Sequence, residues 1–201
     1  MPTGIALRDV REQLFAAAER VLLSAGPNAL TSRAVTAEAG CAKGVLHRHF
    51  PDFDAFLTDF VRERIAGINR LAAELRETAG TGRIGDRLAE TLTDLFDPVT
   101  LAMIGLVIAR DELRARLRRA GSPGIPLLAE ATVMIADYLA AERDAGRLAP
   151  GADVDTLAAM LVGTGHLIFA GRNGTPPDPA VVHKAVATTI SAALRPDGPA
   201  T

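Results

Sequence analysis

Apolar residues recur every three or four positions along most of the chain, which is the spacing of an amphipathic α-helix. No stretch shows the strict alternation of a half-buried strand, so the pattern predicts an all-α protein with about nine helices. The segments with the helical spacing are 7–25, two short ones within 31–50, and then 53–77, 84–96, 99–109, 125–145, 154–170 and 179–194.

The stretch 30–50 predicts two short helices joined by a tight turn, a helix-turn-helix. Thr31 and Ser32 each supply a hydroxyl that can cap the first helix, and Gly40 tolerates the left-handed conformation that ends it. In the second helix Leu46 and Phe50 are four apart and face inward. The remaining positions are free to face outward, where a helix in the major groove makes its contacts. These positions are Lys43, Gly44, Val45, His47, Arg48 and His49.

The rest of the chain predicts a connector and a second helical domain. The helix at 53–77 is about 25 residues and roughly 37 Å long, which is enough to leave one domain and enter another. The helices at 154–170 and 179–194 are apolar around their whole circumference, and a second copy of the chain is the simplest cover for them. We therefore divide the chain into a helix-turn-helix domain, a connecting helix, a ligand-binding and dimerisation domain and a disordered tail, at 1–52, 53–80, 81–195 and 196–201.

Composition adds few constraints. The net charge is −2, but residues 1–50 hold six Lys and Arg against four Asp and Glu, a surplus of two that permits DNA binding without establishing it. Cys41 is the single cysteine, so no internal disulfide can form, and packing is its expected role. The start of the chain lacks a secretion signal, and the most apolar runs are shorter than the roughly 20 residues of a membrane span. We expect a cytoplasmic protein that does not cross a membrane.

The run AGCAKGVLHRHFPDFDAFL, which follows an N-terminal helix and leads into a long helix, closely resembles the tetracycline-repressor (TetR) family of bacterial regulators. The sharp match covers about residues 10–57. The resemblance implies a homodimer, joined through 154–170 and 179–194, that binds double-stranded operator DNA and a small-molecule effector. It implies phosphate contacts from Thr31, Ser32 and Arg33, and base contacts from Lys43, Gly44, Val45 and Arg48, beside His47 and His49.

Three positions depart from the family pattern. His47 replaces a tyrosine that contacts a phosphate, and Phe53 replaces a lysine or arginine at the start of the long helix. Ala42 removes the hydroxyl that usually caps the recognition helix, a loss of roughly 1 kcal/mol. We therefore expect weaker non-specific DNA binding than in a typical relative, with a shallow salt dependence.

The resemblance also implies an effector pocket in the second domain, between the fifth, sixth, seventh and eighth predicted helices. Beyond residue 80 the aromatic residues are too few to cage a large cation, so we expect an apolar or weakly polar effector, or an anionic one if Arg110 faces inward. An ordinary place in the core is an equal alternative for every candidate. The candidate residues are Phe96, Met103, Leu106, Arg110, Met134, Tyr138, His166 and Phe169.

The sequence offers little support for catalysis or for a cofactor. His47 and His49 are two apart and do not share a helix face, and His166 and His183 lie far along the chain, so no metal site is predicted. No Gly-x-Ser-x-Gly sequence and no Gly-rich phosphate loop is present. The predicted function is a ligand-responsive transcriptional regulator, with repression the expected mode. The alternative is a helical small-molecule-binding module whose DNA-binding head is weakened.

Overall fold

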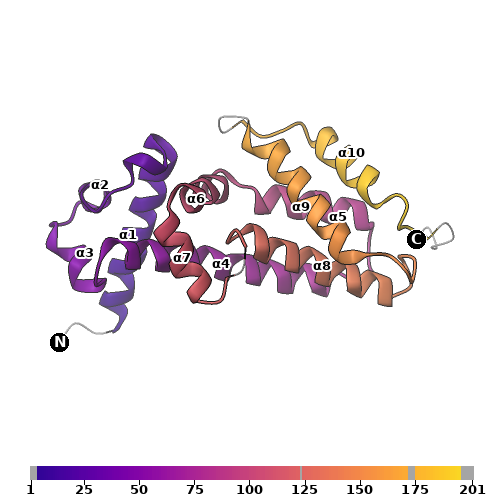
Figure 1. The fold of residues 1–201 in the computed structure, drawn as a ribbon, viewed down its shortest axis with the longest axis horizontal. Coiled ribbons are helices and arrows are strands. Elements are labelled where there is room, and N and C mark those ends of the chain that lie inside the picture. The colour runs from indigo at the N-terminus through magenta and orange to yellow at the C-terminus, as the bar shows by residue number, and fades with distance from the viewer. Residues whose placement is uncertain (1–3, 123, 172–174, 196–201) are drawn as a thin grey trace. The chain divides into compact units, whose positions relative to one another are not determined.

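The computed structural model describes residues 4–122, 124–171 and 175–195, with the side chains of 4–9 left aside. The all-α prediction is confirmed: the described residues form ten α-helices and one short 3₁₀-helix (Figure 1). No single helix within these ranges is long and apolar enough to span a membrane, and the helices at 84–95 and 98–109 reach that length and composition only when taken together as a bent pair. The predicted tail at 196–201 lies outside the described residues.

The described residues form two compact units, one within 1–64 and 98–126 and the other within 65–97 and 127–195. The first unit holds α1 (Gly4–Ala25), η1 (Pro27–Ala29), α2 (Ser32–Glu38), α3 (Gly44–His49), the first half of α4 (Phe53–Glu77), α6 (Pro98–Ala109) and α7 (Asp111–Arg119). The second unit holds the rest of α4 together with α5 (Ile84–Leu95), α8 (Leu128–Asp144), α9 (Val154–Ala170) and α10 (Pro179–Ile190). The predicted division placed all of 81–195 in one domain, whereas in the structure α6 and α7 pack with the N-terminal helices.

Phenylalanine rings form the core of the first unit. The chain has seven phenylalanines, and five of them pack together with neighbouring ring centroids 5.0–6.1 Å apart. This phenylalanine cluster joins α1, the end of α3 and the start of α4. Its members are Phe15, Phe50, Phe53, Phe56 and Phe60.

The sequence does not predict α7 as a helix of its own. The segment 110–119 is strongly charged, and the nine predicted helices do not include it. Leu113 and Leu117 are four residues apart on one face of α7, and both side chains are fully buried. This two-leucine contact holds the helix to the first unit, while the arginines between the leucines lie outward or form ion pairs.

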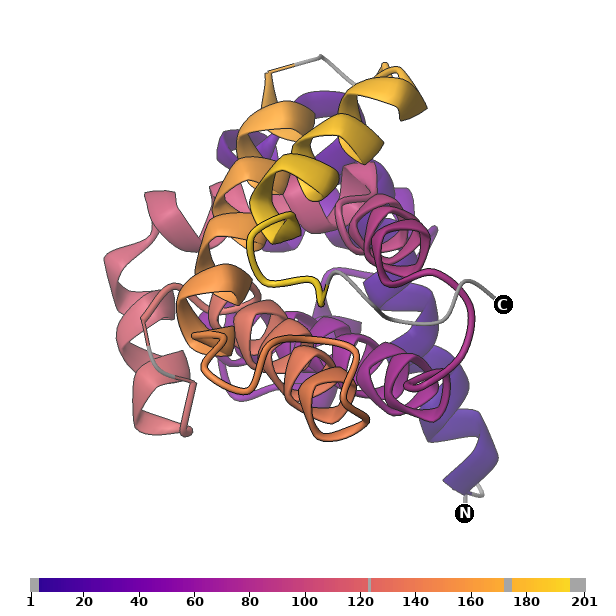
Figure 2. The same ribbon diagram turned by 90° about the vertical axis from the view of Figure 1, so that its right-hand side faces the viewer.

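In the second unit α8 packs along α9, and α10 packs against α5 and α9 (Figure 2). The last predicted helix extended to Leu194, but α10 ends at Ile190. The residues after it turn back, so that the amide of Ala149 donates to the carbonyl of Ala193 at 2.8 Å and Leu148 pairs with Leu194 in an isolated β-bridge. The carbonyl of Ala193 is therefore satisfied by the loop between α8 and α9 and not by a further helical turn.

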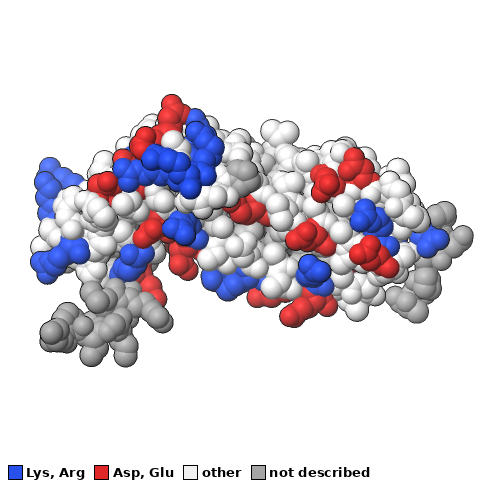
Figure 3. All heavy atoms as spheres, turned by 60° about the horizontal axis from the view of Figure 1, so that its bottom comes forward, with Lys and Arg blue, Asp and Glu red and all other residues white. Residues whose placement is uncertain are grey.

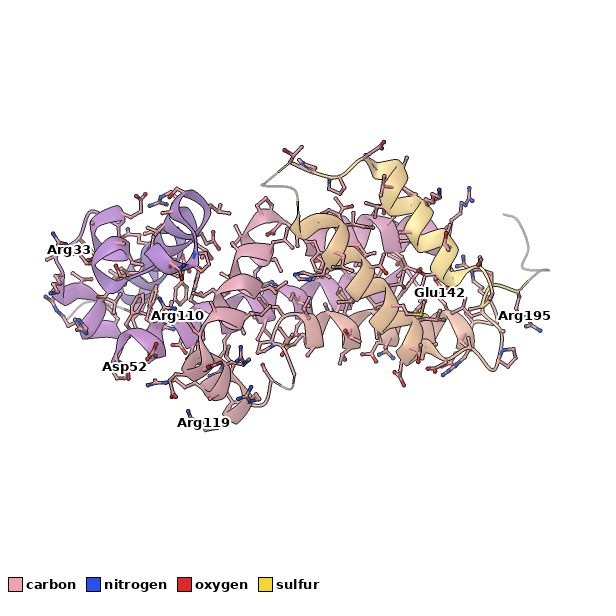
Figure 4. The ribbon with its side chains drawn as sticks, turned by 45° about the horizontal axis from the view of Figure 1, so that its top comes forward. Arg33, Asp52, Arg110, Arg119, Glu142 and Arg195 are labelled. Carbon is pink, nitrogen blue, oxygen red and sulfur yellow. The ribbon has the colours of Figure 1, made fainter. Side chains whose placement is uncertain are left out.

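A buried ion pair fastens this end of the second unit. Glu142 of α8 is 0% exposed and lies inside the unit (Figure 4), where Arg147 Nη1 is 3.2 Å from its Oε2. A second nitrogen of Arg147 donates to the carbonyl of Gly82, and the amide of Arg195 donates to the carbonyl of Arg147. The pair therefore ties the loop after α4 and the segment after α10 to the end of α8.

We predict that Arg147→Met lowers the free energy of unfolding by about 3 kcal/mol, because it leaves the buried Glu142 carboxylate without its counter-charge. Arg143→Met is the matched control: it removes an arginine from the same helix end whose nearest carboxylate, on Asp144, is exposed and 3.9 Å away, and it should cost no more than about 1 kcal/mol. Urea unfolding of both variants measures the difference. Equal losses would contradict the buried-pair account.

Candidate DNA-binding site

The first helix of the motif is fixed at both ends by polar contacts. Thr31 caps α2, its Oγ1 accepting from the amide of Ala34 at 3.1 Å, as the sequence predicts. At the other end Arg20 of α1 donates to Glu38 at 2.6 Å, and Gly40 has the left-handed φ of 63° that the turn requires. The geometry of the turn therefore follows from its sequence.

The second helix, α3, has only six residues and begins without a side-chain cap. Lys43, and not Ala42 as the sequence predicted, stands at its N-cap position and makes no capping hydrogen bond. Leu46 is fully buried and Phe50 joins the phenylalanine cluster. His47, Arg48 and His49 form the last turn of α3, where positive charge is favourable next to the carbonyl end of the helix dipole.

The nine predicted DNA contacts lie on α2, the turn and α3, and most of them face outward. Arg33 points away from the unit at its outer edge (Figure 4). The half-buried members are Ser32, Val45 and His49, and the exposed ones are Thr31, Arg33, Lys43, Gly44, His47 and Arg48. On the face drawn in Figure 3, basic and acidic side chains are interspersed, so the surface carries mixed charge there. The assignment of individual base and phosphate contacts stays a prediction.

The turn after α3 is held by an arginine that the sequence did not identify. Asp52 caps α4, its Oδ1 accepting from the amide of Ala55 at 2.6 Å, and both of its oxygens accept from Arg116 of α7 at 3.2 Å. The Ala55 amide first, and the Arg116 guanidinium second, hold the pKa of Asp52 below its usual value. Arg116 lies in a run of arginines on α7, and the sequence alone does not distinguish it from its neighbours.

Arg110 lies elsewhere than the effector prediction required. Its Nη2 donates to the carbonyl of Leu30, immediately before the motif, at 2.9 Å, and its Cζ lies 5.8 Å from the centre of the Phe53 ring. Both partners belong to the first unit, and Arg110 lies among its helices (Figure 4). The expectation of an anionic effector depended on a free, inward-facing Arg110, so this geometry removes its basis.

The other candidate effector contacts divide between the two units. Met103 and Leu106 are buried on α6 in the first unit. In the second unit the Phe96 ring is 6.0 Å from His166 and 5.7 Å from Phe169, centre to centre, so these three candidates form one aromatic group. Met134 and Tyr138 are buried four residues apart on α8. Their role as ligand contacts stays a prediction.

The state of the Tyr138 phenol and the grouping of possible metal ligands show what other chemistry the described residues can support. Burial, reinforced by the nearby Glu142 carboxylate, raises the pKa of Tyr138 well above its usual value, so the phenol is neutral across physiological pH. No three His, Cys, Asp or Glu side chains in the described part of the chain are grouped so that they could hold a metal ion.

Sequence comparison identifies a known domain at the N-terminal end of this chain. The model of the "Bacterial regulatory proteins, tetR family" matches residues 14–58, from α1 into the first turns of α4. This part of the chain is therefore a helix-turn-helix DNA-binding region of the TetR type. No curated protein is significantly similar to the chain in sequence.

Solved TetR-family structures share the fold over nearly their whole length. The reduced form of NemR from E. coli is 18% identical, with 94% of this chain and 100% of that chain covered and a TM-score of 0.73. A regulator from Mesorhizobium loti is 16% identical, with 92% and 95% covered and a TM-score of 0.71. FadR from Bacillus subtilis, in complex with stearoyl-CoA, is 17% identical, with 90% and 98% covered and a TM-score of 0.68.

We predict that Lys43→Ala and Arg48→Ala each lower the affinity for the operator and relax base preference at one operator position, by about 1–3 kcal/mol each. Both side chains are exposed at the recognition helix and free to reach base edges. Arg76→Ala makes the same change in charge near the end of α4 and serves as the control. Binding to a matched set of single-base operator variants measures the effect; a uniform loss over all variants would assign the residue to phosphate contact instead.

A second prediction concerns acid stability. The lowered pKa of Asp52 means that the ionised carboxylate stabilises the folded chain above the unfolded-state pKa, near 3.8, and that this contribution is lost as pH falls through the lower folded-state pKa. Asp52→Asn should therefore reduce stability at pH 6 and have progressively less effect below about pH 4. Because the Ala55 amide is the larger cause, Arg116→Gln should retain most of this pH dependence. Thermal unfolding from pH 2.5 to 7 tests both variants.

Proposed function

We propose that this protein is a cytoplasmic, non-enzymatic, homodimeric repressor of the TetR family that leaves its operator when a small apolar or weakly polar effector binds. The observation that carries the proposal is the outward face of α3, where Lys43 and Arg48 are exposed on a helix whose opposite side is fixed in the phenylalanine cluster. Two such helices in a symmetric dimer can enter successive major grooves of an operator.

The exposed surface of α9 supports the dimer. Leu167 is 79% exposed and Met160 is 51% exposed on this helix, and Val181 on α10 is 41% exposed. Small residues beside them, such as Ala159 and Ala170, allow a close approach by another helix. A patch of this kind in a soluble chain favours burial against a second copy through α9 and α10.

The apolar interior of the second unit supports the effector class. The rings of Phe96, His166 and Phe169 pack together there, and an aromatic group of this kind suits a ligand held by apolar contact. FadR from Bacillus subtilis has the same fold and was solved with stearoyl-CoA, a molecule with a long apolar chain. We therefore favour an effector whose bound part is apolar.

Two arginines support a route from effector to operator. Arg110 donates to Leu30, just before α2, and Arg116 donates to Asp52, just after α3. Arg110 lies between α6 and α7 and Arg116 lies within α7, so the two arginines hold the motif on both sides. A shift of this region would move the recognition helix, so effector binding can change operator affinity as a population shift between two arrangements.

The alternative is a small-molecule-binding module with a weakened DNA-binding head. Phe53 favours it, since its ring stacks on Phe56 and lies beneath Arg110 in place of a phosphate-binding cation. The uncapped start of α3 favours it as well.

Selection of bound fragments from the genomic DNA of the encoding organism distinguishes the two functions. The purified full-length dimer should retain one or a few fragments that contain an inverted repeat, and Lys43→Ala with Arg48→Ala should release them. A wild-type protein that retains no fragment even at 50 mM salt would support the alternative function.

We predict a shallow salt dependence for the operator complex. Each phosphate neutralised contributes about −0.9 to the slope of log affinity against log salt concentration, and the positions of Phe53 and His47 lack the usual phosphate contacts. The slope for the dimer should therefore be less steep than about −8. Restoring the cation with Phe53→Lys should steepen it. A wild-type slope of −8 or steeper would contradict the predicted loss of phosphate contacts.

A further inference from the structure

The ring of Phe96 packs against α9 at a notch that only glycine can provide. A Cβ atom at Gly165 would lie 2.7 Å from Cε2 and 3.2 Å from Cδ2 of Phe96, and 3.3 Å from Cδ2 of Leu92. Non-bonded carbon atoms normally stay about 3.5–4.0 Å apart, so any side chain at 165 would displace the ring. Glycine weakens a helix interior relative to alanine, and this contact accounts for a buried glycine within α9.

The same notch is one wall of an apolar hollow between α5, α9 and α10. The hollow has about 200 Å³ of empty space, counted with the solvent at its mouth, and Leu92 and Gly165 belong both to its lining and to the contact with Phe96. Its lining contains no charged side chain, and Thr164 and Thr189 contribute the only hydroxyls. In this arrangement the hollow is too narrow to admit a water molecule, while the neighbouring space is filled by the Phe96 ring, which is 2% exposed.

We propose that Phe96 is the gate of a ligand site between α5, α9 and α10, closed when its ring packs on Gly165 and opened when a neutral apolar molecule takes the place of the ring. This inference rests on the proposed function and specifies the site and the regulation of its effector. The uncharged lining selects the ligand class, because an ion would lose its hydration there without gaining a counter-charge. The two threonines allow one weakly polar group on the ligand.

The position of Phe96 in the chain links this gate to DNA binding. Phe96 is the C-cap residue of α5, with its amide donating to the carbonyl of Leu92 at 3.0 Å. Asp97 alone separates it from Pro98, the first residue of α6. If the backbone of Phe96 moves when its ring leaves Gly165, the movement reaches the start of α6 through Asp97 alone. The helix α6 belongs to the unit that carries the helix-turn-helix.

The variant Gly165→Ala tests the gate, because its Cβ occupies the notch and forces the ring toward the open position. Gly67→Ala is the matched control: it makes the same change in the middle of α4, where a Cβ would meet only the end of the flexible Arg70 side chain at 3.7 Å. We expect Gly165→Ala to lower operator affinity at least tenfold, measured well below its melting temperature. We also expect amides in 93–103 to exchange hydrogen at least fivefold faster. The control should stay within twofold of the wild type in both measurements.

The double variant Phe96→Leu with Gly165→Ala separates a gate from general damage. The smaller leucine leaves room for the new Cβ, so operator affinity and hydrogen exchange should return to within threefold of the wild-type values. A Gly165→Ala protein that behaves like the control, or a loss of affinity that the double variant does not restore, would overturn the gate. If Gly165→Ala does not fold, the single variant Phe96→Leu replaces it. Its shorter side chain leaves the notch partly empty and should also speed hydrogen exchange of the amides in 93–103. Unchanged exchange would overturn the gate.

Two probes of nearly equal shape and different charge test the ligand class. Ethylbenzene should raise the melting temperature of the wild-type dimer and lower its operator affinity, whereas benzylammonium should do neither. A stronger response to the cation would overturn the assigned class. If the wild-type protein binds no operator, only the proposed function is overturned. The gate is still tested, because the hydrogen-exchange measurements and the melting shift with ethylbenzene need no DNA.

Discussion

The DNA-reading part of this protein depends on the packing of five phenylalanine rings. The recognition helix α3 has six residues and no side-chain cap, and a helix of that length is not stable by itself in water. Its position is fixed because Phe50 at its end packs edge-on against Phe56 with ring centres 5.0 Å apart. Each such pair adds about 0.5–1.5 kcal/mol beyond the burial of its area. The exposed residues of α3 can therefore be presented to DNA only while this cluster is intact.

The arginines of the α6–α7 region add a second, polar layer around that core. Arg110 reaches the backbone carbonyl of Leu30 and the ring of Phe53, while Arg116 reaches the carboxylate of Asp52. Arg11 contributes from the other side, with its guanidinium 4.6 Å from the centre of the Phe50 ring and 2.8 Å from Asp59. The apolar cluster sets the position of the motif, and these directional contacts limit its rotation, because each joins a specific donor to a specific acceptor.

Local features of the sequence were sufficient for most of the fold, whereas contacts between distant residues were not. The cap at Thr31, the turn at Gly40 and the buried Leu46 each depend on neighbours within a few positions, and all three were predicted correctly. The bond from Arg116 to Asp52 spans 64 positions, and nothing in the charged run of α7 distinguished that arginine from its neighbours. The same limit explains Arg110: helical periodicity shows which side of a segment is apolar, but not which unit that side faces.

The helix α6 connects these observations. Its residues are apolar on all sides, but the helix is not buried all round, because Ile108 is 47% exposed. Its neighbours in the structure are α1 and η1 of the DNA-binding unit. At twelve residues it is about 18 Å long. Phe96 lies two residues before its first residue, and Arg110 follows its last residue. A displacement of α6 would therefore act on the hydrogen bond from Arg110 to the carbonyl of Leu30, which lies immediately before the helix-turn-helix.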